Sequence, residues 1–311
     1  MSQLPSQADA ARAKLDQSAS TGIRASLTSV IVSMILGVVK IISGVLGHSY
    51  ALIADGVESM LDVVSGAIVA GSLKLAAQPP DEKYPFGYGK VEPVAALAIS
   101  TGLLATAVVI AIQSIRDLRA AQRHVPAAFT LIVLVVAVIV KEVLFRFLLR
   151  TSESIDSSAM RTDAWHHRSD SLTSAAAFSG ISIALLGGTR YWPADDWAAL
   201  FAAGVIAFNG VRLLRNSWRE IMDVSLPDQV IDTIRKIARH VDGVAGIDMC
   251  RVRKSGLGLW VDIHVEVHGD MTVRDGHEIA HRVKDALLES DHNIMDAVVH
   301  IEPADESRSS G

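Results

Sequence analysis

The chain has 311 residues, half of them apolar, and a formal net charge of -5 at pH 7. This charge gives no basic signature, so we expect no nucleic-acid partner. One cysteine, Cys250, excludes a disulfide framework within a chain and argues against thiolate metal chemistry. Mean hydropathy is +0.33, and the apolar residues are concentrated before about residue 216. The composition therefore predicts a membrane domain followed by a soluble domain.

Residues 1–20 are polar and alanine-rich without an apolar stretch, so we expect a disordered leader rather than a cleaved signal. After it, six stretches are long and apolar enough to cross a bilayer. They cover residues 24–46, 50–74, 91–115, 126–149, 160–186 and 195–214. An even number of crossings puts both termini on one side of the membrane. Most Lys and Arg residues between spans lie on that side, which predicts that it is cytoplasmic. The exceptions are Arg116, Arg119 and Arg123, which fall on the opposite side.

The pattern changes after Met222, so residues 21–222 are assigned to the membrane domain and 223–304 to a small soluble domain. The second part shows, in order, an amphipathic helix, two strands, a second helix and a last strand. This order predicts an α+β domain of the ferredoxin-like kind, with an open-faced sheet covered on one side. Residues 305–311 are expected to be disordered by composition.

Two pairs of ionisable residues with a spacing of four lie inside the second and fifth predicted spans: Glu58 with Asp62, and His166 with Asp170. Residues four apart share a helix face, so each pair directs two ligand atoms at one point. Two such helices facing each other supply three carboxylates and one imidazole, a set that suits a divalent transition metal. Any one of these residues alone could be a hydrogen-bonded core residue. Four together in a bilayer are costly and indicate function.

Each pair is preceded by an aspartate on the same stripe, Asp55 in the second span and Asp163 in the fifth. An odd number of crossings separates the two spans, so we expect them to run antiparallel. Asp55 would then lie toward the outside and Asp163 toward the cytoplasm, as vestibule or proton-path residues. Metal binding needs a neutral imidazole and ionised carboxylates, so loading releases protons. Lys141 lies toward the inner end of the fourth span, where snorkelling is the simplest interpretation.

These motifs together resemble the cation diffusion facilitator family, bacterial zinc and iron efflux transporters with six spans and a cytoplasmic metal-binding domain. The resemblance extends from about Ser26 to Pro303. Beyond the two helix motifs it includes Ser49–Asp55, Asp81–Glu92, Trp192–Asp195, Ile221–Asp223 and Leu226–Pro227.

The resemblance implies a secondary transporter rather than an enzyme: a homodimer in the lipid of the inner membrane that exports a cytoplasmic divalent metal in exchange for external protons. The transport site that it implies consists of Glu58, Asp62, His166 and Asp170. Zn²⁺ is the cargo that we expect. Three oxygens and one nitrogen also fit Fe²⁺, Co²⁺, Cd²⁺ and Mn²⁺.

In the soluble domain the resemblance implies a second metal site at the dimer contact. It consists of Asp248, His264, His277, His300 and Glu302. Asp248 stands where a histidine is common and Glu302 replaces a bridging aspartate, so the number of metals it holds stays open. The alternative is that His264 and His300 are ordinary surface strand residues.

The loop between the second and third spans carries Tyr84 and Tyr88 where the family has histidines. A phenol with a pKa of about 10 is a poor ligand beside an imidazole, so we expect no accessory metal site at Asp81. Lys90 and Asp223 match charged positions that resemble an interlock near the cytoplasmic surface. A solvated ion pair is the alternative.

Two other functions are compatible with parts of the pattern. A membrane metallohydrolase needs an open metal position for water, which a quartet of protein ligands does not leave, and no HExxH pair is present. The stronger rival is a metal-sensing or scaffold protein of the same fold that no longer transports.

Overall fold

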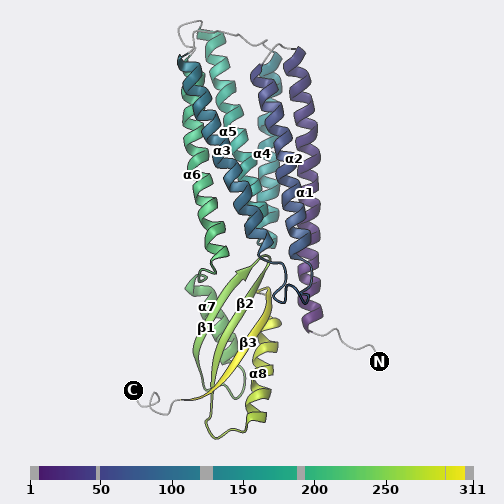
Figure 1. Ribbon diagram of the computed structural model, residues 1–311, viewed down its shortest axis with the longest axis vertical. Coiled ribbons are helices and arrows are strands. Elements are labelled where there is room, and N and C mark those ends of the chain that lie inside the picture. Colours follow the sequence, from purple (N-terminus) through teal and green to yellow (C-terminus); the bar gives the residue numbers. More distant parts are fainter. Residues whose placement is uncertain (1–6, 47–49, 120–128, 188–192, 291, 305–311) are drawn as a thin grey trace, which may run out of the picture.

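The computed structural model describes residues 7–46, 50–119, 129–187, 193–290 and 292–304. In this part of the chain six long helices form a bundle, and a small domain lies at one end of it (Figure 1). The helices of the bundle are α1 (Gln7–Leu46), α2 (Tyr50–Ala76), α3 (Val91–Arg119), α4 (Phe129–Ile155), α5 (Ser158–Gly187) and α6 (Pro193–Ile221).

The prediction that residues 1–20 are a disordered leader is wrong from residue 7 onward, because α1 begins at Gln7. The segment from Ala8 to Leu15 is rich in alanine, leucine, arginine and lysine, which are the strongest helix formers. Leu15 and Ala19 also pack against the core of the bundle. Helix propensity and one apolar face therefore extend α1 well before the first predicted span.

The bundle exposes large apolar side chains and buries charged side chains beside its apolar core. Large apolar side chains such as Ile31, Ile132 and Phe201 are 59%, 69% and 76% exposed, whereas Lys40 and Lys141 are almost completely buried. This inversion is the pattern of a bundle surrounded by lipid.

By length and apolar composition alone, two of the described helical segments qualify as membrane spans, Leu15–Leu46 and Val91–Arg116. Ionisable residues lie inside α2, α4 and α5, among them Asp62, Lys141 and Asp170. Six spans therefore stay a prediction.

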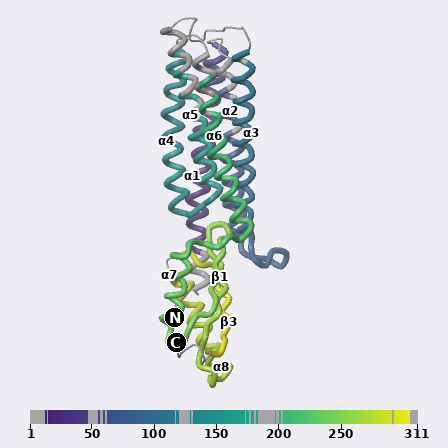
Figure 2. Tube along the Cα trace, turned by 90° about the vertical axis from the view of Figure 1, so that its left-hand side faces the viewer, coloured from purple at the N-terminus to yellow at the C-terminus, as the bar shows by residue number. Residues whose placement is uncertain are grey.

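Helix α1 packs along α2, α3 along α6, and α4 along α5, with α5 also touching α3 and α6 (Figure 2). The contact between α1 and α2 is close at Gly37 and Gly56. A Cβ added to Gly56 would lie 3.0 Å from the backbone nitrogen of Ile41 and 3.1 Å from the carbonyl oxygen of Gly37. Small residues of this kind let two helix backbones approach within a bilayer.

The small domain contains α7 (Asp228–Arg239), β1 (Gly246–Ser255), β2 (Gly258–Val267), α8 (Val273–Leu288) and β3 (Ile294–Pro303). The strand order is β1-β2-β3, with β1 antiparallel and β3 parallel to β2. Both helices pack on the sheet and touch each other, so they cover the same face around a core that includes Ile234, Ile263 and Val283. The predicted order of elements and the covered sheet are confirmed.

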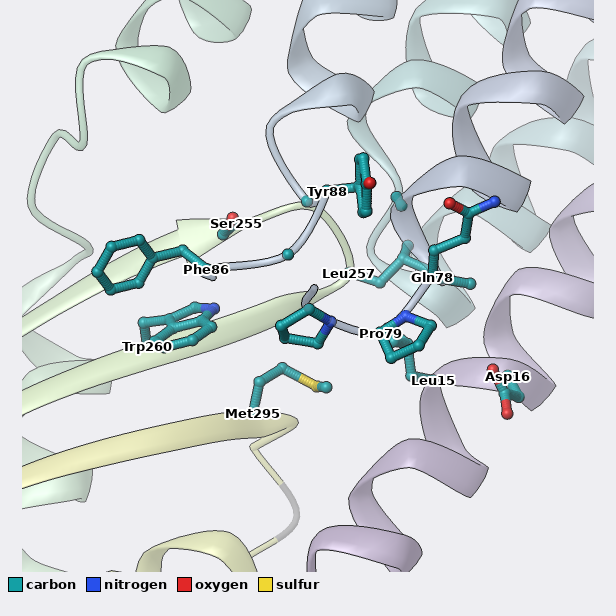
Figure 3. Close-up of a pocket in the computed structure, with 15 residues that line it drawn as sticks. Leu15, Asp16, Gln78, Pro79, Phe86, Tyr88, Ser255, Leu257, Trp260 and Met295 are labelled. Atoms are coloured by element: carbon teal, nitrogen blue, oxygen red, sulfur yellow. The ribbon is translucent and has the colours of Figure 1, made fainter. Parts of the chain in front are cut away.

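The loop between α2 and α3 joins the bundle to the small domain. Phe86 lies edge-on to Trp260 of β2 with ring centroids 5.9 Å apart, and these rings help to line a cavity of about 220 Å³ (Figure 3). Gly89 is so close to the end of β1 that an added Cβ would lie 2.7 Å from the carbonyl oxygen of Ser255. A glycine is therefore needed for the loop to reach the sheet.

Candidate metal centre

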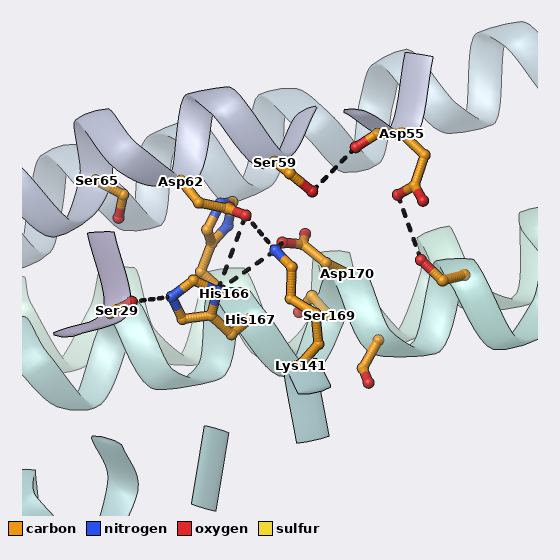
Figure 4. Close-up of polar contacts among 12 residues, drawn as sticks. Ser29, Asp55, Ser59, Asp62, Ser65, Lys141, His166, His167, Ser169 and Asp170 are labelled. Atoms are coloured by element: carbon orange, nitrogen blue, oxygen red, sulfur yellow. Dashed lines mark hydrogen bonds and ion pairs between the residues drawn. The ribbon is translucent and has the colours of Figure 1, made fainter. Parts of the chain in front are cut away.

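Three of the four side chains of the predicted transport site meet in the centre of the bundle. Asp62 of α2 and His166 and Asp170 of α5 are buried, and one ligand atom of each lies within 4.8 Å of the others. His166 Nε2 lies 2.9 Å from Asp62 Oδ1 (Figure 4). The backbone of Glu58 belongs to α2, but its side chain lies outside the described residues. We refer to Asp62, His166 and Asp170 as the central trio.

Contacts between α2 and α5 show that the two helices run antiparallel, as expected. Ser174 donates to Asp55 over 3.3 Å on one side of the central trio. Ser65 donates to Asp163 over 2.5 Å on the other side, which is the side of the small domain. The two outer aspartates therefore flank the central trio at opposite ends.

The interpretation of Lys141 as a snorkelling residue is wrong. Helix α4 continues to Ile155, so Lys141 lies about 21 Å along the axis from that end, beyond the reach of its side chain. The side chain is 1% exposed. Its ammonium forms ion pairs with Asp62 and, over 2.8 Å, with Asp170 (Figure 4). A buried ammonium needs such partners because it has lost its hydration.

A second buried lysine was missed by sequence reasoning. Lys40 of α1 pairs with Asp55 over 2.8 Å and donates to Ser59 over 3.0 Å. The proposed vestibule carboxylate at Asp55 is therefore balanced by a charge from the neighbouring helix. A lysine inside an apolar span was the available signal.

His167 was also missed. Its Nε2 lies 2.8 Å from Ser29 Oγ and 3.8 Å from Asp163 Oδ2, and its Nδ1 lies 3.5 Å from Lys141 Nζ. The spacing of four between Asp163 and His167 was a signal equal to that between His166 and Asp170. The sequence analysis instead assigned Asp163 to the same helix stripe as His166 and Asp170.

In the small domain the structure brings together Asp248, His264 and Glu302, with one ligand atom of each within 4.8 Å of the others. His264 Nδ1 lies 2.7 Å from Glu302 Oε1, and His300 Nε2 lies 3.6 Å from the same oxygen. The parallel register of β2 and β3 pairs His264 with His300 and places their ring centroids 4.9 Å apart. Four of the five predicted residues therefore lie together on the sheet, one from β1, one from β2 and two from β3.

His277 does not join this small-domain group. Its Nε2 lies 3.1 Å from His281 Nε2 on the next turn of α8, with both rings exposed. Residues four apart on one helix face make this pairing local.

Lys90 and Asp223 are in contact, as the predicted interlock requires. Lys90 Nζ also donates to the carbonyl oxygen of Glu220 over 3.0 Å, at the end of α6. A cation favours a helix C-terminus because the last carbonyl groups lack partners within the helix. Asp223 also lies 3.6 Å from Arg253 of β1, so it links the bundle to the small domain.

Asp81 is held within its own loop. Tyr88 donates its hydroxyl to Asp81 Oδ2 over 2.6 Å, and the backbone nitrogens of Lys83 and Tyr84 donate to Oδ1 over 2.9 and 2.6 Å. The pKa of Asp81 is lowered mainly by the hydrogen bond from the Tyr88 hydroxyl. The bond from the backbone nitrogen of Tyr84 makes the second largest contribution. The bond from the Tyr88 hydroxyl also raises the pKa of Tyr88 to about 12. The tyrosine that replaces a family histidine thus acts as a donor to Asp81.

Comparison with known proteins shows the family to which the chain belongs. The cation efflux transmembrane domain matches residues 26–222, and the cation efflux protein cytoplasmic domain matches residues 226–304. The chain belongs to the cation efflux, or cation diffusion facilitator, family of membrane transporters, as the sequence predicted.

Three relatives cover most of the chain. The manganese efflux system protein MneP of Bacillus subtilis is 27% identical over 284 residues, 90% of this chain and 95% of the relative. Metal tolerance protein 2 of Oryza sativa subsp. japonica is 31% identical over 294 residues, 86% of this chain and 75% of the relative. Magnetosome protein MamB of Paramagnetospirillum magneticum is 28% identical over 265 residues, 85% of this chain and 88% of the relative.

Proposed function

We propose that this chain exports a divalent transition metal from the cytoplasm across the inner membrane in exchange for protons. The observation that carries this proposal is the central trio, in which two carboxylates and one imidazole from α2 and α5 meet inside a bundle with an apolar exterior. Charged groups are expensive in a bilayer unless they serve a function. Glu58, one turn before Asp62 on the same helix, is the proposed fourth ligand.

The exchange of metal for protons follows from the ligand chemistry. A metal binds ionised carboxylates and a neutral imidazole, so its arrival displaces protons and protonation expels it. We propose His166 as the main proton carrier because the ordinary pKa of histidine is nearest to working pH. Asp55 and Asp163, on opposite sides of the trio, are the proposed entry and exit residues for a site that is exposed alternately to each side.

We also propose six membrane crossings, with residues 21–222 as the transport domain and both termini in the cytoplasm. The small domain, residues 223–304, is the proposed dimerisation domain. Its group around His264, His300 and Glu302 is a proposed second metal site that senses the cytoplasmic metal. Lys90 and Asp223 are proposed to fix the two domains to each other.

Zn²⁺ remains the first ion to test, since imidazole with carboxylates suits it. Mn²⁺ is the second, because one relative is a manganese efflux protein and carboxylate oxygens favour harder ions. Direct competition between the two ions during transport measures the preference.

A transport-inactive metal sensor of the same fold is the second candidate. The observation that favours it is Lys141, whose ammonium already balances Asp62 and Asp170. A site with an internal cation is stable without metal, and the group in the small domain would then be the metal-binding site.

Flux through the purified full-length chain in proteoliposomes distinguishes the two functions. With Zn²⁺ outside and a fluorescent zinc indicator inside, an outward proton gradient is expected to accelerate uptake. Asp62→Asn is expected to abolish the flux, whereas Glu153→Gln, at an exposed carboxylate of α4, keeps it. Zn²⁺ binding without flux in the unmodified chain would establish the sensor instead.

A further inference from the structure

The ammonium of Lys141 is bound by the same two carboxylates that are proposed to hold the metal. It contacts Asp62 Oδ2 and lies 2.8 Å from Asp170 Oδ2. Figure 4 shows it between the two carboxylates, reaching in from a different helix than either. Asp62 Oδ1, the other oxygen of the first carboxylate, faces His166.

A metal and this ammonium cannot share these oxygens. A transition metal lies about 2.0–2.2 Å from a carboxylate oxygen, and the ligand atoms of the central trio are already within 4.8 Å of one another. A cation coordinated by Asp62 and Asp170 would therefore lie against the ammonium. Repulsion between a divalent and a monovalent charge in contact in a dry interior is strong.

We propose that Lys141 is the resident counter-cation of the transport site, which the incoming metal must displace from Asp62 and Asp170. This inference rests on the proposed function of the central trio. Lys141 is a positioning residue in this scheme, not a ligand. It holds the two carboxylates together when no metal is bound, weakens metal binding by competition, and promotes release when it returns.

The surroundings give the displaced ammonium a place to go. His167 Nδ1 lies 3.5 Å from Lys141 Nζ and is not part of the trio. The other ring nitrogen of His167 is 2.8 Å from Ser29, and Asp163 supplies a carboxylate oxygen 3.8 Å from that nitrogen. A rotation of the flexible lysine side chain therefore keeps its charge within a polar region while the trio binds metal.

The test is equilibrium binding of Zn²⁺ alone to the full-length chain in lipid nanodiscs, measured by titration calorimetry. All variants carry His264→Ala so that the small-domain group does not dominate the signal. Lys141→Met removes the competitor and is expected to tighten Zn²⁺ binding about 10- to 100-fold, the range for one or two charge-assisted hydrogen bonds. It is also expected to slow Zn²⁺ release in a stopped-flow chase with a chelator.

Lys141→Arg keeps the charge, so it remains informative if Lys141→Met does not fold. A guanidinium can hold two carboxylates with a planar fork of donors, and we expect about tenfold weaker Zn²⁺ binding. Lys40→Met is the matched control. It also removes a buried ammonium, but from Asp55, and its effect on Zn²⁺ affinity should be much smaller than that of Lys141→Met.

Unchanged or weaker Zn²⁺ binding in folded Lys141→Met overturns the inference, as does unchanged or tighter binding in Lys141→Arg. Equal tightening in Lys40→Met overturns it too, because the effect would then be a general result of lost charge. If the unmodified chain transports Zn²⁺ and requires Asp62, these results reject the role of Lys141 alone. Absence of both binding and flux in the unmodified chain rejects the transport site itself.

Discussion

Removal of the Asp170 charge should destabilise the protein through Lys141 and not only through the metal. In Asp170→Asn the ammonium keeps Asp62 as a partner but loses the carboxylate that lies 2.8 Å away. Because the lysine side chain is 1% exposed, water cannot replace the lost partner. The double variant Asp170→Asn with Lys141→Met also removes the ammonium and leaves Asp62 with His166 as its partner, so it measures the coupling between Lys141 and Asp170 and is not expected to restore the original stability.

The magnitude follows from the distance. At 2.8 Å and an effective dielectric constant of about 20, the attraction between two unit charges is about 6 kcal/mol. Measured losses on breaking one buried ion pair are about 3–5 kcal/mol, because the surroundings relax. We expect the lower end, about 3 kcal/mol, since Asp62 still faces the ammonium. For a chain of this size that corresponds to a decrease of about 6 °C in Tm.

The assay is thermal unfolding of the full-length chain in detergent, followed by tryptophan fluorescence with a chelator present so that bound metal does not contribute. Lys141→Met alone completes a double-mutant cycle. A coupling energy of about 2 kcal/mol or more between the two positions is expected. Additive effects would mean that Lys141 and Asp170 do not form an ion pair in the folded protein, and the described centre of the site would be incorrect.

Three further outcomes test other parts of the molecule. Gly56→Val should lower the stability by about 1–3 kcal/mol, because the added atoms collide with the backbone of α1; Gly71→Val, whose Cβ would meet nothing within 4 Å, is the control in the same thermal assay. Lys254→Met removes the contacts of 2.7 and 3.1 Å from Lys254 Nζ to the carbonyl and carboxylate oxygens of Asp156. Because these contacts hold the turn between α4 and α5, the variant should show faster amide hydrogen exchange there. An unchanged exchange pattern would contradict this contact. His264→Ala should remove one class of Zn²⁺ binding in calorimetry while proton-driven flux continues, and complete loss of flux would mean that the small domain is required for transport.

The sequence was sufficient for those features that depend on local spacing. Residues four apart on α2 and α5 were expected to share a face, and Asp62, His166 and Asp170 do meet. The alternation of helix and strand in the small domain likewise predicted its sheet, because each element has a distinct hydrophobic period. The shared face within each helix depends on neighbours along the chain, whereas the contact between α2 and α5 was expected only because ligands from two helices are needed to complete one metal site.

Features that depend on which helices touch were not accessible from spacing. Lys40 and Lys141 are single residues in apolar helices, and their partners lie on other helices. Without the packing of α1 on α2 and α4 on α5, a lone lysine is compatible with either snorkelling or pairing. The extent of α4 decides between them, and helix ends are the least reliable part of a prediction from sequence.

The turn between α4 and α5 connects the small domain to the helices of the proposed transport site. Helix α4 supplies Lys141 and ends at Ile155, and α5 begins at Ser158 and supplies two members of the central trio. Lys254 of β1 holds this turn at Asp156, through both its main chain and its carboxylate. A movement of the sheet would therefore be transmitted to the turn where α4 and α5 meet. With metal and ammonium competing for the same oxygens, as proposed, a change in the positions of α4 and α5 would alter the balance between them, and any such coupling would act equally from the central trio on the small domain.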